Sequence, residues 1–192
     1  KNEWHDVYAT DTALQYDTRY KKGGRYENTV NLLRRTLSES EEKVKIVATG
    51  QMTSLARLLM SGPDAYSQLS GVELVRQKVE AAACMAGRFF ETWPEPVVLG
   101  DGYVVDEEWN VTCDIEAAQT VCRQWPSELV FCSYEIGWKM ITCGGLQTKG
   151  SKNNPVRTCY ETWSSKEGGG AVGRESWDSA TMLYAIRPWE GY

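Results

Sequence analysis

Histidine and paired metal-binding cysteines are scarce in this chain. His5 is its one histidine, and none of the six cysteines belongs to a Cys-x-x-Cys pair. A structural zinc site needs four such ligands at short spacings, so the sequence argues against one. Six cysteines leave a disulfide framework open as an alternative. Cys84 and Cys132, however, lie in apolar strand-like runs, where a cysteine is usually a small buried hydrophobic residue, and this favours free thiols.

Long apolar runs and long basic runs are also missing. No apolar stretch approaches the roughly 20 residues that a transmembrane helix needs, and the start, KNEWHDVYATD, does not resemble a signal peptide. With 21 Lys and Arg against 26 Asp and Glu, the net charge is -5. We therefore expect neither a nucleic acid nor a membrane as the main partner. The sequence does not decide between a cytoplasmic and an exported bacterial protein.

The chain does contain an alternation of short apolar strands and amphipathic helices. Its 192 residues, of which 42% are hydrophobic, fit one globular domain over residues 1–192. The alternation predicts an α/β fold with an open, mostly parallel, Rossmann-like sheet and helices on both faces. We expect strands over 44–49, 81–87 and 128–134. We expect helices over 27–40, 52–60, 72–79, 114–124 and 177–186, and the last two have Asp114 and Ser176 as N-caps. The rest is expected to be irregular structure over 1–26 and long loops over 88–105 and 144–172.

Polar residues follow the ends of the predicted strands. In a parallel α/β sheet, ligands bind beyond the carboxyl ends of the strands. Thr49, Met85 and Glu135 lie at such ends. Glu108 and Asn110 come after the second strand, just before a helix, and place an acid and an amide two residues apart. The residues by themselves therefore predict a polar site at this edge of the sheet.

Four motifs follow one another along the chain. They are VATGQMTSLARLL from position 47, CMAG from position 84, EEWNVTCDIEAA from position 107 and SWDSATMLYA from position 176. In order and separation they resemble the inosine-uridine preferring nucleoside hydrolase family over about residues 27–187. Each motif alone is weak, but four in register make the resemblance specific. It implies the nucleoside hydrolase fold.

Members of that family hydrolyse the N-glycosidic bond of nucleosides and hold a calcium ion that binds the ribose diol and a water nucleophile. The departing base leaves an oxocarbenium-like sugar, which carboxylates and amides can stabilise. Calcium prefers oxygen ligands and lowers the pKa of bound water. The resemblance implies that Thr49 offers its backbone carbonyl to calcium, and that Asp178 contacts both the metal and the ribose diol. The expected partner is therefore a nucleoside or a related ribosyl small molecule.

The resemblance also gives the acid and the amide a role. Glu108 and Asn110 correspond to residues that hold the ribose hydroxyls, and Met85 to a methionine that lines the sugar pocket. We expect Trp109, which lies between the acid and the amide, to point into the core. Simpler alternatives stay open. Glu108 and Asn110 fit ordinary loop residues beside a helix cap, Met85 fits a core residue, and Asp178 fits an acid favoured by a helix dipole.

This chain departs from the family pattern at several positions. Trp177 stands where many members have a histidine that protonates the departing base, so no catalytic residue is assigned, and Trp177 is equally a chemical participant or a packing residue. Ser54 and Gly102 stand where the family often has asparagine. The SWD sequence at 176 and the EIG sequence at 135 resemble a bacterial subgroup with less certain substrates.

The family's N-terminal strand carries a D-x-D-x-G-x-D-D cluster that supplies most calcium ligands and the general base. The early acids of this chain lack that spacing and follow no apolar strand. We therefore expect the C-terminal portion of such a domain, which by itself neither binds calcium tightly nor hydrolyses nucleosides. Such a chain exposes an apolar sheet edge, so we also expect a homo-oligomer.

Two functions fit these observations. The first is part of a calcium-dependent ribohydrolase that acts on nucleosides. The alternative is a non-catalytic relative that binds a sugar or a nucleoside, or a structural module. Glu108, Asn110 and Asp178 favour the first for the intact protein, whereas the absent acidic cluster and the missing histidine favour the second for this chain.

Overall fold

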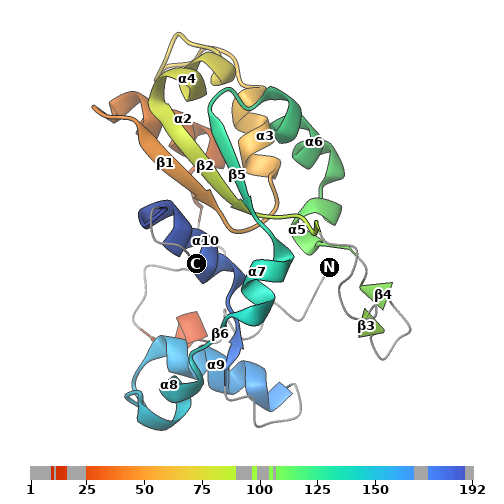
Figure 1. Cartoon of the computed structure of the whole chain (residues 1–192). Coiled ribbons are helices and arrows are strands. Elements are labelled where there is room, and N and C mark those ends of the chain that lie inside the picture. Colours follow the sequence, from red (N-terminus) through yellow and green to blue (C-terminus); the bar gives the residue numbers. More distant parts are fainter. Residues whose placement is uncertain are drawn as a thin grey trace. The chain divides into compact units, whose positions relative to one another are not determined.

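The computed structural model describes residues 10, 12–16, 25–89, 97–98, 104–105, 107–166 and 173–188. The chain divides into two compact units (Figure 1). The sheet unit comprises Glu27–Lys139 and Ser176–Tyr192, and the small unit comprises Lys1–Tyr26 and Met140–Glu175. Each unit is described by itself below. The single domain expected from the chain length stays a prediction.

Three parallel strands form the centre of the sheet unit. In spatial order they are β1 (Val44–Ala48), β2 (Val79–Met85) and β5 (Glu128–Cys132). Ala48 pairs with Cys84, and Met85 pairs with Cys132, so the three strands end at the same edge. The open parallel sheet expected from the sequence is confirmed.

Four helices enclose the hydrophobic core against one face of this sheet (Figure 1). They are α2 (Thr29–Glu39), α3 (Thr53–Leu59), α4 (Gly71–Lys78) and α6 (Ile115–Gln124). Leu58 of α3, Val75 of α4 and Val121 of α6 are all 0% exposed, as is Val79 of β2. Burial of such side chains stabilises a fold by about 1.5–3 kcal/mol each. The apolar spacing that predicted these helices therefore corresponds to their core-facing sides.

Local capping explains where these helices begin. Ser70 and Glu73 form a capping box at the start of α4, with 2.8 Å from the Ser70 backbone nitrogen to Glu73 Oε2. Asp114 caps α6, as expected, because its side chain accepts a backbone N–H of the first turn. Ser176 is the N-cap residue of α10 (Trp177–Ile186), also as expected, but its side chain makes no capping hydrogen bond.

Helix α10 packs on the opposite face of the sheet. Ala81 and Ala83 of β2 project from that face, and Ala185 of α10 lies beside them. Lys45 of β1 donates from Nζ to the carbonyl of Ala185 at 3.4 Å. Small side chains on both elements allow a close approach. Helices on both faces of the sheet, as the sequence predicted, are confirmed.

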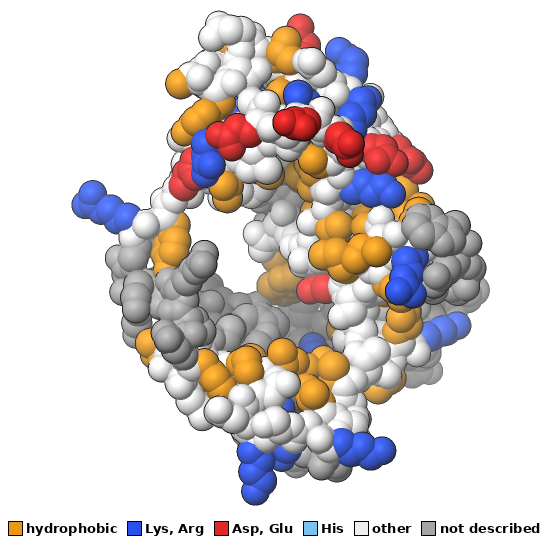
Figure 2. Space-filling view, turned by 90° about the vertical axis from the view of Figure 1, so that its left-hand side faces the viewer, with side chains coloured by type: hydrophobic (Ala, Val, Ile, Leu, Met, Phe, Trp, Pro, Cys, Tyr) orange, Lys and Arg blue, Asp and Glu red, His pale blue; other side chains and the backbone are white. Residues whose placement is uncertain are grey.

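Charged side chains on the sheet unit are mixed in sign. Arg35 Nη2 lies 2.7 Å from Glu27 Oε2, and Lys45 Nζ lies 3.8 Å from Glu80 Oε1. Figure 2 shows acidic side chains in a row with basic side chains beside them. Apolar side chains also reach the surface, among them Ile186 of α10. The expected homo-oligomer stays a prediction. In the described part of the chain, no helix combines the length and apolar character that crossing a membrane requires.

The small unit contains helices where the sequence predicted a long loop over 144–172. Its elements are β6 (Ile141–Thr142), α8 (Gly144–Lys149), α9 (Pro155–Lys166) and β7 (Arg174–Glu175), with β6 and β7 antiparallel. The loop prediction is wrong because local capping outweighs a polar composition. Asn154 Oδ1 accepts from the N–H groups of Val156 at 2.9 Å and Arg157 at 3.3 Å, and Pro155 is preorganised for a first helical position.

Two other irregular segments of the prediction also contain regular structure. Residues 12–15 are helical, and the Tyr16 hydroxyl lies 2.6 Å from Thr158 Oγ1 of α9. The segment 88–105 includes β3 (Val97–Val98) and β4 (Val104–Val105), which pair antiparallel. Most of the remaining residues in both segments lie outside the described part of the chain, among them Gly102.

The six cysteines are free, and Cys84 and Cys132 are buried. The favoured expectation of free thiols is therefore confirmed. Burial raises the pKa of Cys84 to about 12. At neutral pH this residue is a protonated thiol, and it behaves as a small hydrophobic core residue.

A buried arginine holds the turn between α3 and α4. Arg34 of α2 is 1% exposed, and it donates to the two carboxylate oxygens of Asp64 at 2.7 and 3.2 Å. It also donates to Ser61 Oγ at 2.9 Å and to the carbonyls of Ser67 and Leu69 at 3.0 and 2.9 Å. The guanidinium lowers the pKa of Asp64. This pair therefore stabilises the fold above the unfolded pKa of Asp64, and that contribution is lost as the pH falls through the lowered folded pKa.

Replacing Arg34 by lysine should lower the free energy of unfolding by about 3 kcal/mol, because an ammonium cannot reach all of these acceptors. Denaturant unfolding followed by circular dichroism measures this change. Arg35→Lys is the matched control on the same helix, since the Arg35 ion pair lies at the surface and should contribute little. Equal effects of the two substitutions would contradict the role assigned to Arg34.

Candidate functional site

The carboxyl ends of the three strands meet at one edge of the sheet unit. Thr49 directly follows β1, whose last residue pairs with the strand β2. Beyond the strands, the backbone nitrogen of Ala86 donates to the carbonyl of Cys132 at 3.3 Å, and that of Tyr134 donates to the carbonyl of Gly87 at 2.9 Å. At the predicted polar edge, the segments that follow β2 and β5 are therefore joined by backbone hydrogen bonds.

Glu108 braces the end of β2 against a short helix. It is the N-cap of α5 (Trp109–Thr112) and is 6% exposed. Its Oε2 accepts from the backbone nitrogens of Gly87 at 2.9 Å and Val111 at 3.1 Å, and its Oε1 accepts from that of Asn110 at 2.9 Å. A buried carboxylate is costly unless it is hydrogen-bonded, and here three N–H groups compensate it.

Asn110 joins the same structure through its amide group. Its Nδ2 donates to the carbonyl of Met85 at 2.9 Å and lies 3.2 Å from Met85 Sδ. Met85 is 4% exposed, at the last position of β2. The structure thus brings together Met85, Glu108 and Asn110, three residues that the sequence placed in one site.

Trp109 does not point into the core, and that expectation is wrong. Its side chain is 51% exposed. The side chains of Glu108 and Asn110 are both directed toward the end of β2. With both of its neighbours bonded to the end of β2, the Trp109 side chain is left at the surface.

The turn after β2 is held from a second side. Gly87 has φ of +85°, and a Cβ atom at this position would lie 2.8 Å from the ring of Phe89. The backbone nitrogen of Phe89 donates to Oε1 of Glu135 at 2.8 Å. Glu135 belongs to α7 (Tyr134–Lys139) and is 5% exposed. Glu135 was expected at a strand end but was not assigned to the site, although its place in the EIG sequence was a usable signal.

The first and third motifs also meet. The hydroxyl of Thr53 donates to Oδ2 of Asp114, and the Ala117 backbone nitrogen donates to Oδ1 at 3.1 Å. These hydrogen bonds, that of Thr53 foremost, lower the pKa of Asp114. This residue therefore fixes α3 to α6 beside the strand ends.

Trp177 is packed in an aromatic cluster. Its Nε1 donates to the carbonyl of Tyr134 at 2.8 Å, and its ring stacks on that of Tyr134 with centroids 5.4 Å apart. The ring centroid of Trp138 lies 6.4 Å away. A Cβ atom at Gly137 would lie 2.3 Å from Trp177, so only glycine allows this contact. The structure thus gives Trp177 a packing role between α7 and α10.

Asp178 lies in the first turn of α10, directly after Trp177. The residue as a whole is exposed, but partial burial of its carboxyl raises its pKa. A carboxylate that is desolvated in this way is more common at functional sites than elsewhere.

Within the described ranges, no three His, Cys, Asp or Glu side chains are grouped so that they could hold a metal ion. The carbonyl of Thr49 and the carboxylate of Asp178 are oxygen donors of the kind that calcium prefers, but calcium takes six to eight oxygens.

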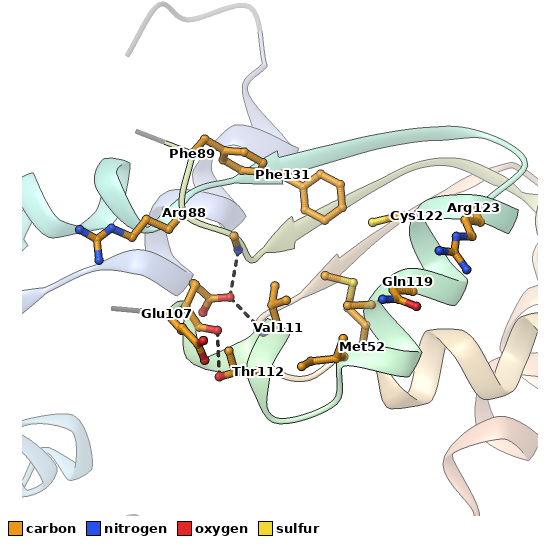
Figure 3. Close-up of a pocket in the computed structure, with 14 residues that line it drawn as sticks. Met52, Arg88, Phe89, Glu107, Val111, Thr112, Gln119, Cys122, Arg123 and Phe131 are labelled. Carbon is orange, nitrogen blue, oxygen red and sulfur yellow. Dashed lines mark hydrogen bonds between the residues drawn. The ribbon is translucent and has the colours of Figure 1, made fainter. Parts of the chain in front are cut away.

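An open cavity of about 970 Å³ lies beside Glu108 (Figure 3). On the sheet side, the rings of Phe89 and Phe131 lie 6.2 Å apart, and α6 contributes Cys122 and Arg123 to the other wall. Of the site residues predicted from the sequence, Glu108 lines this cavity, whereas the others do not. Glu108 is therefore the residue that the cavity and the cluster of Met85 and Asn110 share.

Asp178→Asn should raise the melting temperature at pH 7 by about 2 °C, because the raised pKa means that burial disfavours the charged form. The difference should shrink as the pH falls through the raised folded pKa and vanish below the unfolded pKa, where the carboxyl is neutral in both the folded and the unfolded protein. Asp114→Asn is the matched control with the opposite sign, since the pKa of Asp114 is lowered. Thermal unfolding between pH 3 and pH 7 measures both; a lower melting temperature for Asp178→Asn at pH 7 would refute this view.

Comparison with known proteins identifies relatives of this chain. The family model for the inosine-uridine preferring nucleoside hydrolases matches residues 6–190. The pyrimidine-specific ribonucleoside hydrolase RihA of Escherichia coli O1:K1 is 27% identical over 167 residues, which cover 83% of this chain and 47% of RihA. The chain thus spans about half the length of the curated relatives it matches.

Solved structures share the fold. The type III effector protein XopQ, complexed with adenosine diphosphate ribose, is 20% identical with a TM-score of 0.60, over 82% of this chain and 52% of XopQ. The inosine-uridine preferring nucleoside hydrolase from Bacillus anthracis is 21% identical with a TM-score of 0.57, over 85% of this chain and 49% of that enzyme. Since the family model also spans nearly all of the sequence, the chain belongs to the inosine-uridine preferring nucleoside hydrolase family.

Proposed function

We propose that this chain forms part of a hydrolase that cleaves the N-glycosidic bond of a nucleoside or a related ribosyl compound. The observation that carries the proposal is the direct contact of Asn110 with Met85 beside the buried Glu108, in a chain of this family. RihA is named for pyrimidine ribonucleosides, and XopQ was solved with a ribosyl ligand. A pyrimidine ribonucleoside is therefore the first substrate to test.

In this proposal, Asn110 binds a ribose hydroxyl through its amide oxygen. Its Nδ2 already donates to the carbonyl of Met85, which fixes the orientation of the amide. The oxygen Oδ1 is therefore the atom that would accept a hydrogen bond from the sugar. Hydrogen bonds to ribose hydroxyls that strengthen as positive charge develops on the sugar lower the barrier.

In this proposal, the main role of Glu108 is structural. A carboxylate has about four lone-pair directions, and three backbone N–H groups already occupy Glu108. One direction at most is left for a ribose hydroxyl. The residue thus fixes Asn110 and the end of β2 relative to each other, and contributes a single contact to the sugar.

Calcium in the intact protein is part of this proposal. The carbonyl of Thr49 and the carboxylate of Asp178 would supply two of its oxygen ligands, and the ion would supply an activated water. Asp178 would also accept a hydrogen bond from the ribose diol and so orient the sugar. Because two donors do not complete a calcium shell, this chain alone should neither bind calcium tightly nor hydrolyse nucleosides.

Trp177 does not replace the histidine that many family members use to protonate the base. An indole N–H is not an acid at neutral pH, and this one donates to the carbonyl of Tyr134. Departure of the base must therefore be assisted by another group. The same observation supports the second candidate function, a non-catalytic relative that binds a sugar or a nucleoside.

An assay of the intact protein with uridine, cytidine, inosine and adenosine tests the proposal. We expect release of ribose that requires calcium and falls at least 100-fold in Asp178→Asn. Ser179→Ala, a change at the exposed neighbouring position, is the matched control and should retain activity. No release from any of these nucleosides by a folded protein would favour the binding function.

Substitutions of Glu108 and Asn110 distinguish a structural role of the first from a sugar contact of the second. Glu108→Gln should lower the free energy of unfolding by about 2 kcal/mol, because one acceptor oxygen is replaced by a donor that faces N–H groups. Asn110→Ala should instead lower kcat/KM for the preferred nucleoside roughly 10- to 100-fold, or about 1.4–2.7 kcal/mol, with a smaller loss of stability. The reverse pattern, in which Asn110→Ala mainly unfolds the protein, would contradict these roles.

A further inference from the structure

Two buried carboxylates hold the short turn that follows β2. Glu108 accepts from the backbone nitrogen of Gly87 at 2.9 Å, and Glu135 accepts from that of Phe89 at 2.8 Å. The two acids come from different elements, the cap of α5 and the first turn of α7. Both are about 95% buried. Burying two carboxylates near one turn is costly, so their hydrogen bonds to this backbone must define its conformation closely.

This turn determines where the sugar-contacting groups lie. It starts two residues after Met85, whose carbonyl orients Asn110. Gly87 has a positive φ, which its neighbours would not adopt at low cost. Its carbonyl also accepts from the backbone nitrogen of Tyr134, the first residue of α7. A shift of the turn would therefore move the carbonyl that fixes the Asn110 amide.

Helix α7 also contacts the other part of the ribose site. The carbonyl of Tyr134 accepts from Trp177 Nε1 at 2.8 Å. Gly137 lies so close to Trp177 that no larger residue fits, and its carbonyl accepts from the backbone nitrogen of Ser176 at 3.2 Å. Asp178 directly follows Trp177 in the sequence. One short helix is thus bonded both to the turn beside Met85 and to the residues that precede Asp178.

We propose that Glu135 is a positioning residue of the ribose site, and that α7 sets the separation between Asn110 and Asp178. Glu135 acts through the backbone of Phe89, and it does not itself contact the sugar. The inference rests on the function proposed above. It adds a residue and an element whose contribution is to align two groups that lie far apart in the sequence.

Hydrogen–deuterium exchange of the intact protein tests the first part. In Glu135→Ala, the amides of Gly87 and Phe89 should exchange at least tenfold faster than in the wild type, while the core amides of β2 stay protected. Glu135→Gln should restore protection, because its amide oxygen still accepts from Phe89. Glu128→Ala, at an exposed glutamate of β5, is the control and should change neither amide.

Kinetics and binding with uridine test the second part. We expect Glu135→Ala to lower kcat/KM at least tenfold, mainly through kcat, with Glu135→Gln near the wild type. If Glu135→Ala does not fold, the same comparison is made between Glu135→Gln and Glu135→Asp, whose shorter side chain cannot reach Phe89. Faster exchange together with lower kcat supports the proposal.

Two results would overturn the positioning role, and a third would overturn the proposed function instead. Unchanged exchange at Phe89 would overturn the positioning role whatever the activity. Faster exchange with unchanged kcat and KM would show that the turn does not align the sugar, and would also overturn it. A wild-type protein that neither binds nor cleaves uridine or the other nucleosides would overturn the proposed function instead, and the exchange data would still decide whether Glu135 holds the turn.

Discussion

The carboxylate of Glu108 is the constraint on which the rest of the site depends. Three backbone N–H groups converge on it, one from the turn after β2 and two from α5. Charged acceptors form stronger hydrogen bonds than neutral ones, and a nearly dry environment strengthens them further. This carboxylate therefore connects the central strand to the segment that carries Asn110. It thereby helps to hold the amide that we propose to contact the ribose, together with the bond from Asn110 to the carbonyl of Met85.

The family motifs of this chain are bonded to one another and to neighbouring helices. Thr53 and Asp114 join the first motif to the third, and Trp177 joins the last motif to α7. In the first case a side chain bonds to another motif, and in the second it bonds to the helix α7. The replacement of the usual histidine by Trp177 follows the same pattern, because a stacked indole strengthens the contact between two helices and at the same time removes a proton donor.

Much of the fold and part of the site could be predicted from the sequence. Short apolar runs identified the three parallel strands, because a strand buried on both faces is apolar at nearly every position. Amphipathic spacing identified helices such as α2 and α3, because burial of one helix face recurs every three to four residues. The boundaries of α10 and the cap at Asp114 were also correct. The helix α9 was missed because its cap, Asn154 before Pro155, lies in a polar segment without an apolar repeat. The orientation of Trp109 was wrong, because the bonds of its two neighbours decide it.

The sequence by itself determined the α/β alternation, the family and the set of residues at the strand ends, because these depend on local pattern and on motif spacing. Only the tertiary structure decided what those residues contact. It showed that Glu108 is largely occupied by backbone N–H groups, that Met85 orients Asn110, and that Glu135 lies against the same turn. The reason is physical. A hydrogen bond between groups 20 to 50 positions apart in the sequence depends on how the helices and strands pack. Neither composition nor periodicity shows which of these groups come close together in space.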